Sequence, residues 1–168
     1  MKKQPYADTA VPADKSCTDI ERLLTKYEAE GVRWTKMKGE PRTLEFIFTV
    51  TVNGVQTQLG FRLTPPVIMV RKRSGGRYGS LITTRNEDAE MRLMWWYLKT
   101  RLEAVATGME TLEEALMSKI MLALPDETGK VRVTTAGEAI KEQIVNPKRK
   151  GLLPSFRIET EALPEANE

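Results

Sequence analysis

The chain has 168 residues, of which 40% are hydrophobic, and a net charge of +3 at neutral pH. This composition is sufficient for one soluble domain with a buried core. No apolar run approaches the length that crosses a bilayer, so we expect a cytoplasmic protein without membrane contact. The single cysteine, Cys17, excludes an internal disulfide, and the absence of histidine removes the commonest ligand of zinc, haem and non-haem iron sites. We therefore expect no cofactor or metal site, and a buried or idle thiol at Cys17.

The first ordered element is predicted to begin near Thr18. Residues 1–15 mix Pro, Ala, Lys and Asp without periodicity, which is typical of a flexible N-terminal arm. Thr18 and Glu21 have the spacing of a capping box, in which two side chains satisfy the free amides at a helix start. A short amphipathic helix follows, and Gly31 is expected to end it.

The clearest strand pattern surrounds a predicted tight turn. Residues 32–37 alternate weakly and are predicted to form an edge strand, whereas residues 44–52 and 55–63 alternate more clearly between apolar and polar side chains. Asn53-Gly54 separates the two clearer runs and favours a two-residue hairpin, because both central residues of that turn need positive φ. The apolar positions of both strands then fall on one face of a sheet.

A second pair of short strands is predicted at residues 67–70 and 79–83, joined by a basic loop at 71–78. The loop contains glycines, no acid, and a cluster of cations with one aromatic residue: Arg71, Lys72, Arg73, Arg77 and Tyr78. Such a loop can follow a phosphate backbone while the tyrosine stacks on a base. The alternative interpretation is a solubilising hairpin tip.

The strongest helical pattern runs from Asn86 to Met109. Its apolar residues recur in steps of four and three, which places them on one stripe: Met91, Trp95, Leu98, Leu102, Val105 and Met109. Asn86 can cap the start of the helix, and Gly108 offers the left-handed residue that ends one. We expect this helix to cover the apolar face of the sheet, with Trp95 in the core.

Two further capping boxes are predicted after the long helix. Thr111 and Glu114 begin a second helix that folds back as a helical hairpin. Its apolar face is formed by Leu112, Leu116, Ile120 and Ala123. A short strand is expected at Val131 to Val133, and Thr135 with Glu138 is expected to cap a last helical turn or two.

Together these elements predict an α+β fold: a small, mostly antiparallel β-sheet with one face covered by the long helix, plus an N-terminal helix and a helical hairpin. We expect a single α+β domain over residues 16–145. Residues 146–168 are rich in Pro and charge, which indicates a flexible tail. An apolar stretch in this tail at residues 152–158, including Leu152 and Phe156, is a candidate linear segment for contact with a protein partner.

Four stretches of the chain read TDIERLLTKYEAEGV, LGFRLTPP, MWWYLKTRLEAVATGMETLEEALMSKIML and LPDETGK. Together they resemble a family of uncharacterised small proteins encoded by tailed phages, prophages and plasmids. The resemblance covers roughly residues 18–130 and depends most on the LEAV-x-x-G-x-x-x-x-EE spacing. The basic loop at 71–78 and the insertion of Glu127-Thr128 before Gly129 depart from the family pattern. Because the family has no assigned chemistry, the resemblance implies a mobile-element setting and little more.

Two other groups of basic residues would form one continuous positive surface with the basic loop if the fold brings all three to the same side of the molecule. The first surrounds Trp34 on the expected edge strand, and the second begins the tail; their candidate contact residues are Arg33, Trp34, Lys36, Lys148, Arg149 and Lys150. If the groups do not meet, they are ordinary solvated surface. Trp96 lies about 100° round the helix from Trp95, so it is a candidate for a partly exposed partner-binding side chain.

No pattern in the sequence indicates an enzyme. Glu87 and Glu114 are explained by the helix dipole and a cap, and no phosphate-cradling glycine motif or serine elbow is present. We expect a non-enzymatic nucleic-acid-binding accessory protein of a phage or mobile element, with DNA or RNA as its partner and binding through charge and stacking. The alternative is a protein-protein interaction module, such as an inhibitor or adaptor of a host or element-encoded machine.

Overall fold

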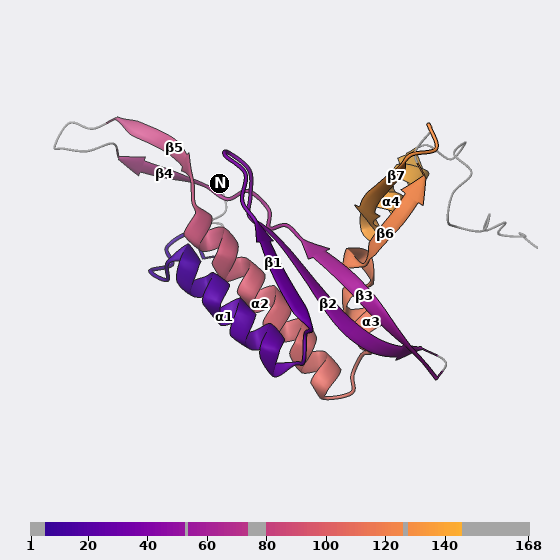
Figure 1. Cartoon of the computed structure of the whole chain (residues 1–168). Coiled ribbons are helices and arrows are strands. Elements are labelled where there is room, and N and C mark those ends of the chain that lie inside the picture. The colour runs from indigo at the N-terminus through magenta and orange to yellow at the C-terminus, as the bar shows by residue number, and fades with distance from the viewer. Residues whose placement is uncertain (1–5, 53, 74–79, 126–127, 146–168) are drawn as a thin grey trace, which may run out of the picture.

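The computed structural model describes residues 6–52, 54–73, 80–125 and 128–145. A three-stranded antiparallel sheet of order β1-β2-β3 is covered on one face by helices α1 and α2, and two further two-stranded sheets, β4-β5 and β6-β7, extend from this body (Figure 1). The predicted α+β fold is confirmed. The single antiparallel sheet that we expected is divided into three separate sheets.

The central sheet confirms the predicted hairpin. β1 (Gly31–Thr35) is the edge strand, and β2 (Thr43–Val52) pairs with β3 (Val55–Leu63). Gly54 has the expected positive φ of 81°, and Asn53 lies outside the described residues. The edge strand ends two residues earlier than the weak alternation indicated.

The core lies between this sheet and the two long helices. Phe46 stacks on its cross-strand partner Phe61, with ring centroids 5.3 Å apart, and Phe48 contacts both rings edge-on. The largest fully buried apolar side chains come from α1, α2, α3, β2 and β3: Phe46, Phe61, Ile20, Leu24, Leu44, Met91, Leu98, Leu102 and Leu116. Burial of these apolar side chains is the main contribution to the stability of the body.

The first helix begins earlier than predicted. α1 (Ala13–Lys26) starts after Pro12, and the Thr18 hydroxyl donates to the Asp14 carbonyl within the helix, so the capping box expected at Thr18 is wrong. The amide of Ala13 donates instead to Asp88 Oδ1 at 2.7 Å. A carboxylate from another helix therefore supplies the cap, and residues 13–15 are not part of a flexible arm.

Cys17 lies on the buried stripe of α1, as expected. Burial raises the pKa of its thiol, although the nearby Arg42 guanidinium opposes this effect. The thiol is therefore kept neutral, which makes it a poor nucleophile.

The long helix α2 (Glu87–Ala106) has both predicted ends. The Asn86 side chain accepts a hydrogen bond from the Ala89 amide, and Gly108 has φ of 75°. The buried face is rotated from the predicted stripe, because Met94 is buried, Trp95 is only half-buried at the edge of the core, and Met109 is 79% exposed. α2 packs against both α1 and the sheet, so its buried surface is wider than one stripe.

The helix expected over residues 112–123 is wrong. α3 (Leu112–Leu116) has the predicted Thr111 capping box, but it passes into a 3₁₀ turn, η1 (Met117–Lys119), and then into strand β6 (Met121–Pro125). Ile120 forms an antiparallel bridge with Phe61, which requires extended backbone at this point. The second helix of the predicted hairpin is therefore limited to α3, which packs back against α2.

The C-terminal elements complete the described chain. β7 (Val131–Thr135) pairs with β6 and leads into α4 (Ala136–Val145), which is longer than the one or two turns expected. Thr135 and Glu138 form the predicted reciprocal cap. None of the described helices is long and apolar enough to cross a membrane.

Candidate nucleic-acid interface

The most basic element of the described chain is a hairpin that stands apart from the body. Among the strands that the structure describes, β4 (Met69–Arg73) and β5 (Leu81–Arg85) pair only with each other, and their hairpin projects from the body at the start of α2 (Figure 1). The predicted loop at 71–78 is thereby corrected, because Arg71, Lys72 and Arg73 belong to strand β4. Arg71 is exposed to solvent. Three of the four predicted cations therefore occupy a two-stranded ribbon of fixed register.

The root of this hairpin is fixed by a buried ion pair. Glu90 on α2 is 0% exposed, and its carboxylate accepts hydrogen bonds from Arg85 Nε at 2.8 Å and from the Ile68 amide at 3.0 Å. The Asn86 amide donates to the Ile68 carbonyl at 2.7 Å. The hydrogen bond to Glu90 raises the pKa of Arg85, so the guanidinium stays charged. The two ends of the hairpin are thus joined to the first turn of α2.

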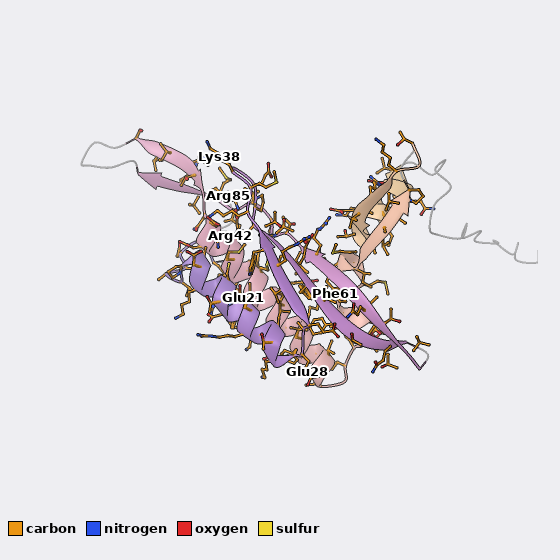
Figure 2. All side chains as sticks on the ribbon, in the orientation of Figure 1. Glu21, Glu28, Lys38, Arg42, Phe61 and Arg85 are labelled. Atoms are coloured by element: carbon orange, nitrogen blue, oxygen red, sulfur yellow. The ribbon has the colours of Figure 1, made fainter. Side chains whose placement is uncertain are left out.

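The β1–β2 connection brings a second basic group to the same root. Arg85 Nη1 donates to the Glu40 carbonyl at 2.6 Å, which ties the connection to the hairpin. Lys38 and Arg85 lie close to the point where the hairpin leaves the body (Figure 2). Lys36 pairs with Glu87 at 3.0 Å, so its charge is partly neutralised, whereas Lys38 is exposed.

Arg33 and Trp34 do not join this basic surface. Arg33 forms an ion pair with Glu45 on β2, and Arg62 binds the same carboxylate at 2.8 Å from the other side. Burial of Glu45 opposes its ionisation, but the hydrogen bonds from both arginines lower its pKa overall. Trp34, the next residue along β1, packs against the core and donates from Nε1 to Glu21 Oε1 at 2.8 Å.

Trp96 lies on a separate aromatic surface of α2. Its ring is 37% exposed and stacks with Tyr6 at a centroid distance of 6.5 Å. Arg92 covers the neighbouring Trp95 ring at 4.1 Å, and Lys99 lies 5.3 Å from the Trp96 ring. This arrangement gives α2 a partly covered cation-aromatic patch.

The remaining candidate residues lie outside the described part of the chain: Arg77, Tyr78, Lys148, Arg149, Lys150, Leu152 and Phe156.

Sequence reasoning missed two features of the hairpin. The lack of acids noted at 71–78 extends over the whole stretch between Glu45 and Glu87, which contains the entire hairpin. The hairpin also carries exposed apolar side chains, since Met69, Leu81 and Ile82 are 44%, 67% and 45% exposed. A count of acidic residues would have found the first feature. The second depends on the absence of a covering layer, which no local pattern shows.

Within residues 6–52, 54–73, 80–125 and 128–145, no three cysteine, aspartate or glutamate side chains gather in a way that could hold a metal ion. Glu87 and Glu90, in the first turn of α2, are instead paired with cations. Arg42 binds Asp14 at 2.8 Å and also contacts Glu87, whose pKa is lowered by hydrogen bonds from Lys36 and Arg42 that outweigh the opposing effect of burial.

The chain matches no protein family, and neither curated proteins nor solved structures show significant similarity to it.

Proposed function

We propose that this chain is a non-enzymatic nucleic-acid-binding accessory protein that contacts DNA or RNA through the β4–β5 hairpin. The observation that carries the proposal is the hairpin's geometry: a basic, acid-free ribbon that pairs with no other described strand and projects from the body. We place its action in the cytoplasm of a cell that carries a phage or another mobile element, on the resemblance described above.

A two-stranded ribbon has suitable dimensions for nucleic acid. The major groove of B-form DNA is about 12 Å wide and admits such a ribbon. Arg71 is free to reach phosphate oxygens, because it has no carboxylate partner among the described residues. Exposed Leu81 and Ile82 can contact sugars or bases in the groove. The ion pair at the root holds the ribbon in one direction, which reduces the entropy lost on binding.

The test is a binding titration at two salt concentrations with single- and double-stranded DNA and RNA. The full chain is compared with a variant in which Arg71, Lys72, Arg73 and Arg77 are replaced by Ser. We expect weaker binding and a salt dependence that is flatter by about one unit of slope for each lost duplex phosphate contact. Thermal melting should change little, because none of the hairpin side chains that the structure describes belongs to the core.

A matched control removes the same number of positive charges away from the hairpin. Lys15, Arg22 and Lys26 on α1 and Lys141 on α4 are replaced by Ser. This variant should bind as the parent does if the hairpin is the contact. Equal weakening of both variants would show that net charge alone drives binding. Absence of binding by the parent at low salt would overturn the proposal.

Tyr78→Ala separates stacking from charge. An unpaired base offers its face to an aromatic ring, whereas a duplex base does not. We expect this change to weaken binding to single strands more than binding to duplex, and equal effects on both would argue against stacking.

A protein-interaction module is the second candidate function, and the exposed apolar side chains favour it. Leu81 and Ile82 on the hairpin and Trp96 on α2 could be buried by a partner surface. Salt separates the two functions, because an apolar protein interface responds weakly to ionic strength.

A further inference from the structure

A cavity of about 310 Å³ lies between α2, the end of β3 and η1. This volume is at the small end of the range found for small-molecule sites, roughly 300–1,000 Å³. The cavity lies farther along α2 than the root of the β4–β5 hairpin, and its lining also includes Thr64, Pro65 and Pro66, which precede that root in the chain.

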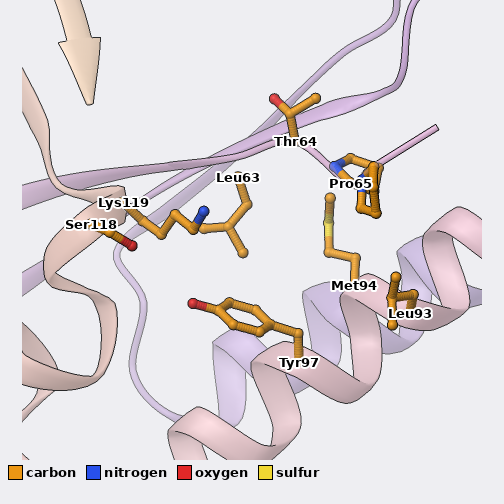
Figure 3. A pocket seen from close by; sticks show the side chains of 9 residues that line it. Leu63, Thr64, Pro65, Leu93, Met94, Tyr97, Ser118 and Lys119 are labelled. Atoms are coloured by element: carbon orange, nitrogen blue, oxygen red, sulfur yellow. The ribbon is translucent and has the colours of Figure 1, made fainter. Parts of the chain in front are cut away.

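One end of the cavity is apolar. Leu63 and Met94, which are only 3% and 4% exposed, form the edge of the core at this point, and Leu93 adds a half-buried side chain (Figure 3). These groups can bury a hydrocarbon or aromatic body, and the thioether of Met94 can adapt its shape to a ring.

The other end of the cavity is polar and positive. Figure 3 shows the Tyr97 hydroxyl and the Lys119 ammonium group pointing into the space, with Ser118 at the same end. Neither Lys119 nor Tyr97 is paired with a carboxylate of any described residue, and no acidic side chain lines the cavity. Three side chains that can donate hydrogen bonds thus line this part of the cavity.

We propose that this cavity binds a small organic carboxylate with an apolar body, such as an arylalkanoate. The carboxylate accepts hydrogen bonds from Lys119, Tyr97 and Ser118, and charge-assisted bonds of this kind are stronger than neutral ones. The apolar body lies against Leu63 and Met94. An amine or a neutral hydrocarbon of the same shape lacks the group that Lys119 recognises.

The probe for the test is 3-phenylpropionate, with 3-phenylpropan-1-ol as the neutral comparison. The full chain is labelled with ¹³C at the methionine methyl groups, and the Met94 signal is assigned from Met94→Leu. We expect saturable movement of the Met94 signal with the carboxylate. The signal of Met109, which is 79% exposed and does not line the cavity, should stay in place.

Two variants make the result specific. Lys119→Gln should weaken binding of 3-phenylpropionate about tenfold, which is the size expected for a hydrogen bond to a charged group. Lys141→Gln removes an exposed lysine from α4 and should leave binding unchanged. The free spectra of both variants show whether they are folded. The proposal fails if the Met94 signal does not move, if the alcohol binds as well as the carboxylate, or if Lys119→Gln binds as the parent does.

Discussion

The two hairpins β2–β3 and β4–β5 have the same antiparallel pairing but opposite surroundings. In the first, the cross-strand partners Phe46 and Phe61 are 1% and 0% exposed, whereas in the second Leu81 and Ile82 remain 67% and 45% exposed. A two-stranded hairpin alone is marginally stable in water. The first is stabilised by the core, and the second depends on its backbone ladder and on the Glu90–Arg85 ion pair at its root. The β2–β3 hairpin therefore contributes to the stability of the core, whereas the β4–β5 hairpin presents charge to solvent.

The largest expected effect comes from the buried hairpin. Phe61→Ala should lower the free energy of unfolding by about 3–5 kcal/mol, because it leaves a cavity beside the rings of Phe46 and Phe48. Urea denaturation followed by circular dichroism measures this loss. A variant as stable as the parent would show that the sheet does not carry the core.

A smaller but still large loss is expected at the root of the exposed hairpin. Glu90→Ala should cost about 3 kcal/mol, since it leaves the Arg85 guanidinium without its buried partner. Adding Arg85→Met should recover part of the loss. As a control, Glu103→Ala removes a surface ion pair with Lys99 and should cost less than about 1 kcal/mol. Equal losses in Glu90→Ala and Glu103→Ala, measured by urea denaturation, would contradict a structural role for the buried pair.

The turn of the buried hairpin should be sensitive to backbone geometry. Gly54→Val should cost roughly 1–2 kcal/mol, because a side chain is strained at its φ of 81°. Gly31→Ala is the matched control, since Gly31 lacks positive φ and a Cβ there would meet no neighbour. Similar melting temperatures for the two variants would rule out this turn conformation.

Glu45, between Arg33 and Arg62 on the central sheet, should make the free energy of unfolding depend on pH. Because the pKa of Glu45 is lowered in the folded state, its interactions stabilise the protein above the unfolded pKa of about 4.3 and are lost as pH falls through the folded pKa. Glu45→Gln should remove at most about 1 kcal/mol at pH 7. It should also flatten the loss of stability on acidification. An unchanged acid-unfolding profile would argue against the Arg33–Glu45–Arg62 network.

The smallest effect is expected on the exposed hairpin. Leu81→Ser should change the free energy of unfolding by less than about 0.5 kcal/mol, because the side chain is 67% exposed. A larger loss in urea denaturation would mean that the hairpin is covered by other groups in solution.

Local patterns predicted the body because local and tertiary forces agree there. The alternation in residues 44–63 matches a face that is buried, and Asn86 and Thr111 cap their helices with neighbouring amides. The start of α1 could not be predicted in this way, because its cap comes from Asp88, which is distant in sequence. The short apolar run after Leu116 fits a helix or a strand equally well, and pairing with β3 and β7 decides in favour of the strand.

The candidate site was predicted only in part. The cations at 71–73 were identified from the sequence, but they were assigned to a loop because the segment lacks apolar alternation. A strand that is exposed to solvent does not need this alternation, because either of its faces can carry charge. The role of Glu90 was hidden, because an acid in the first turn of a helix is already explained by the dipole. Its burial follows from the position of Ile68 and Arg85, which only the tertiary structure gives.

The pairing at the base of the β4–β5 hairpin also suggests that another segment can replace this hairpin. Met69 and Arg85 face each other across the ladder, so the chain enters and leaves the hairpin at neighbouring points. Residues 70–84 could be replaced by an Asn-Gly turn while Arg85 keeps its bond to Glu90. The body would then serve as a scaffold that accepts ribbons of other lengths and sequences at this position.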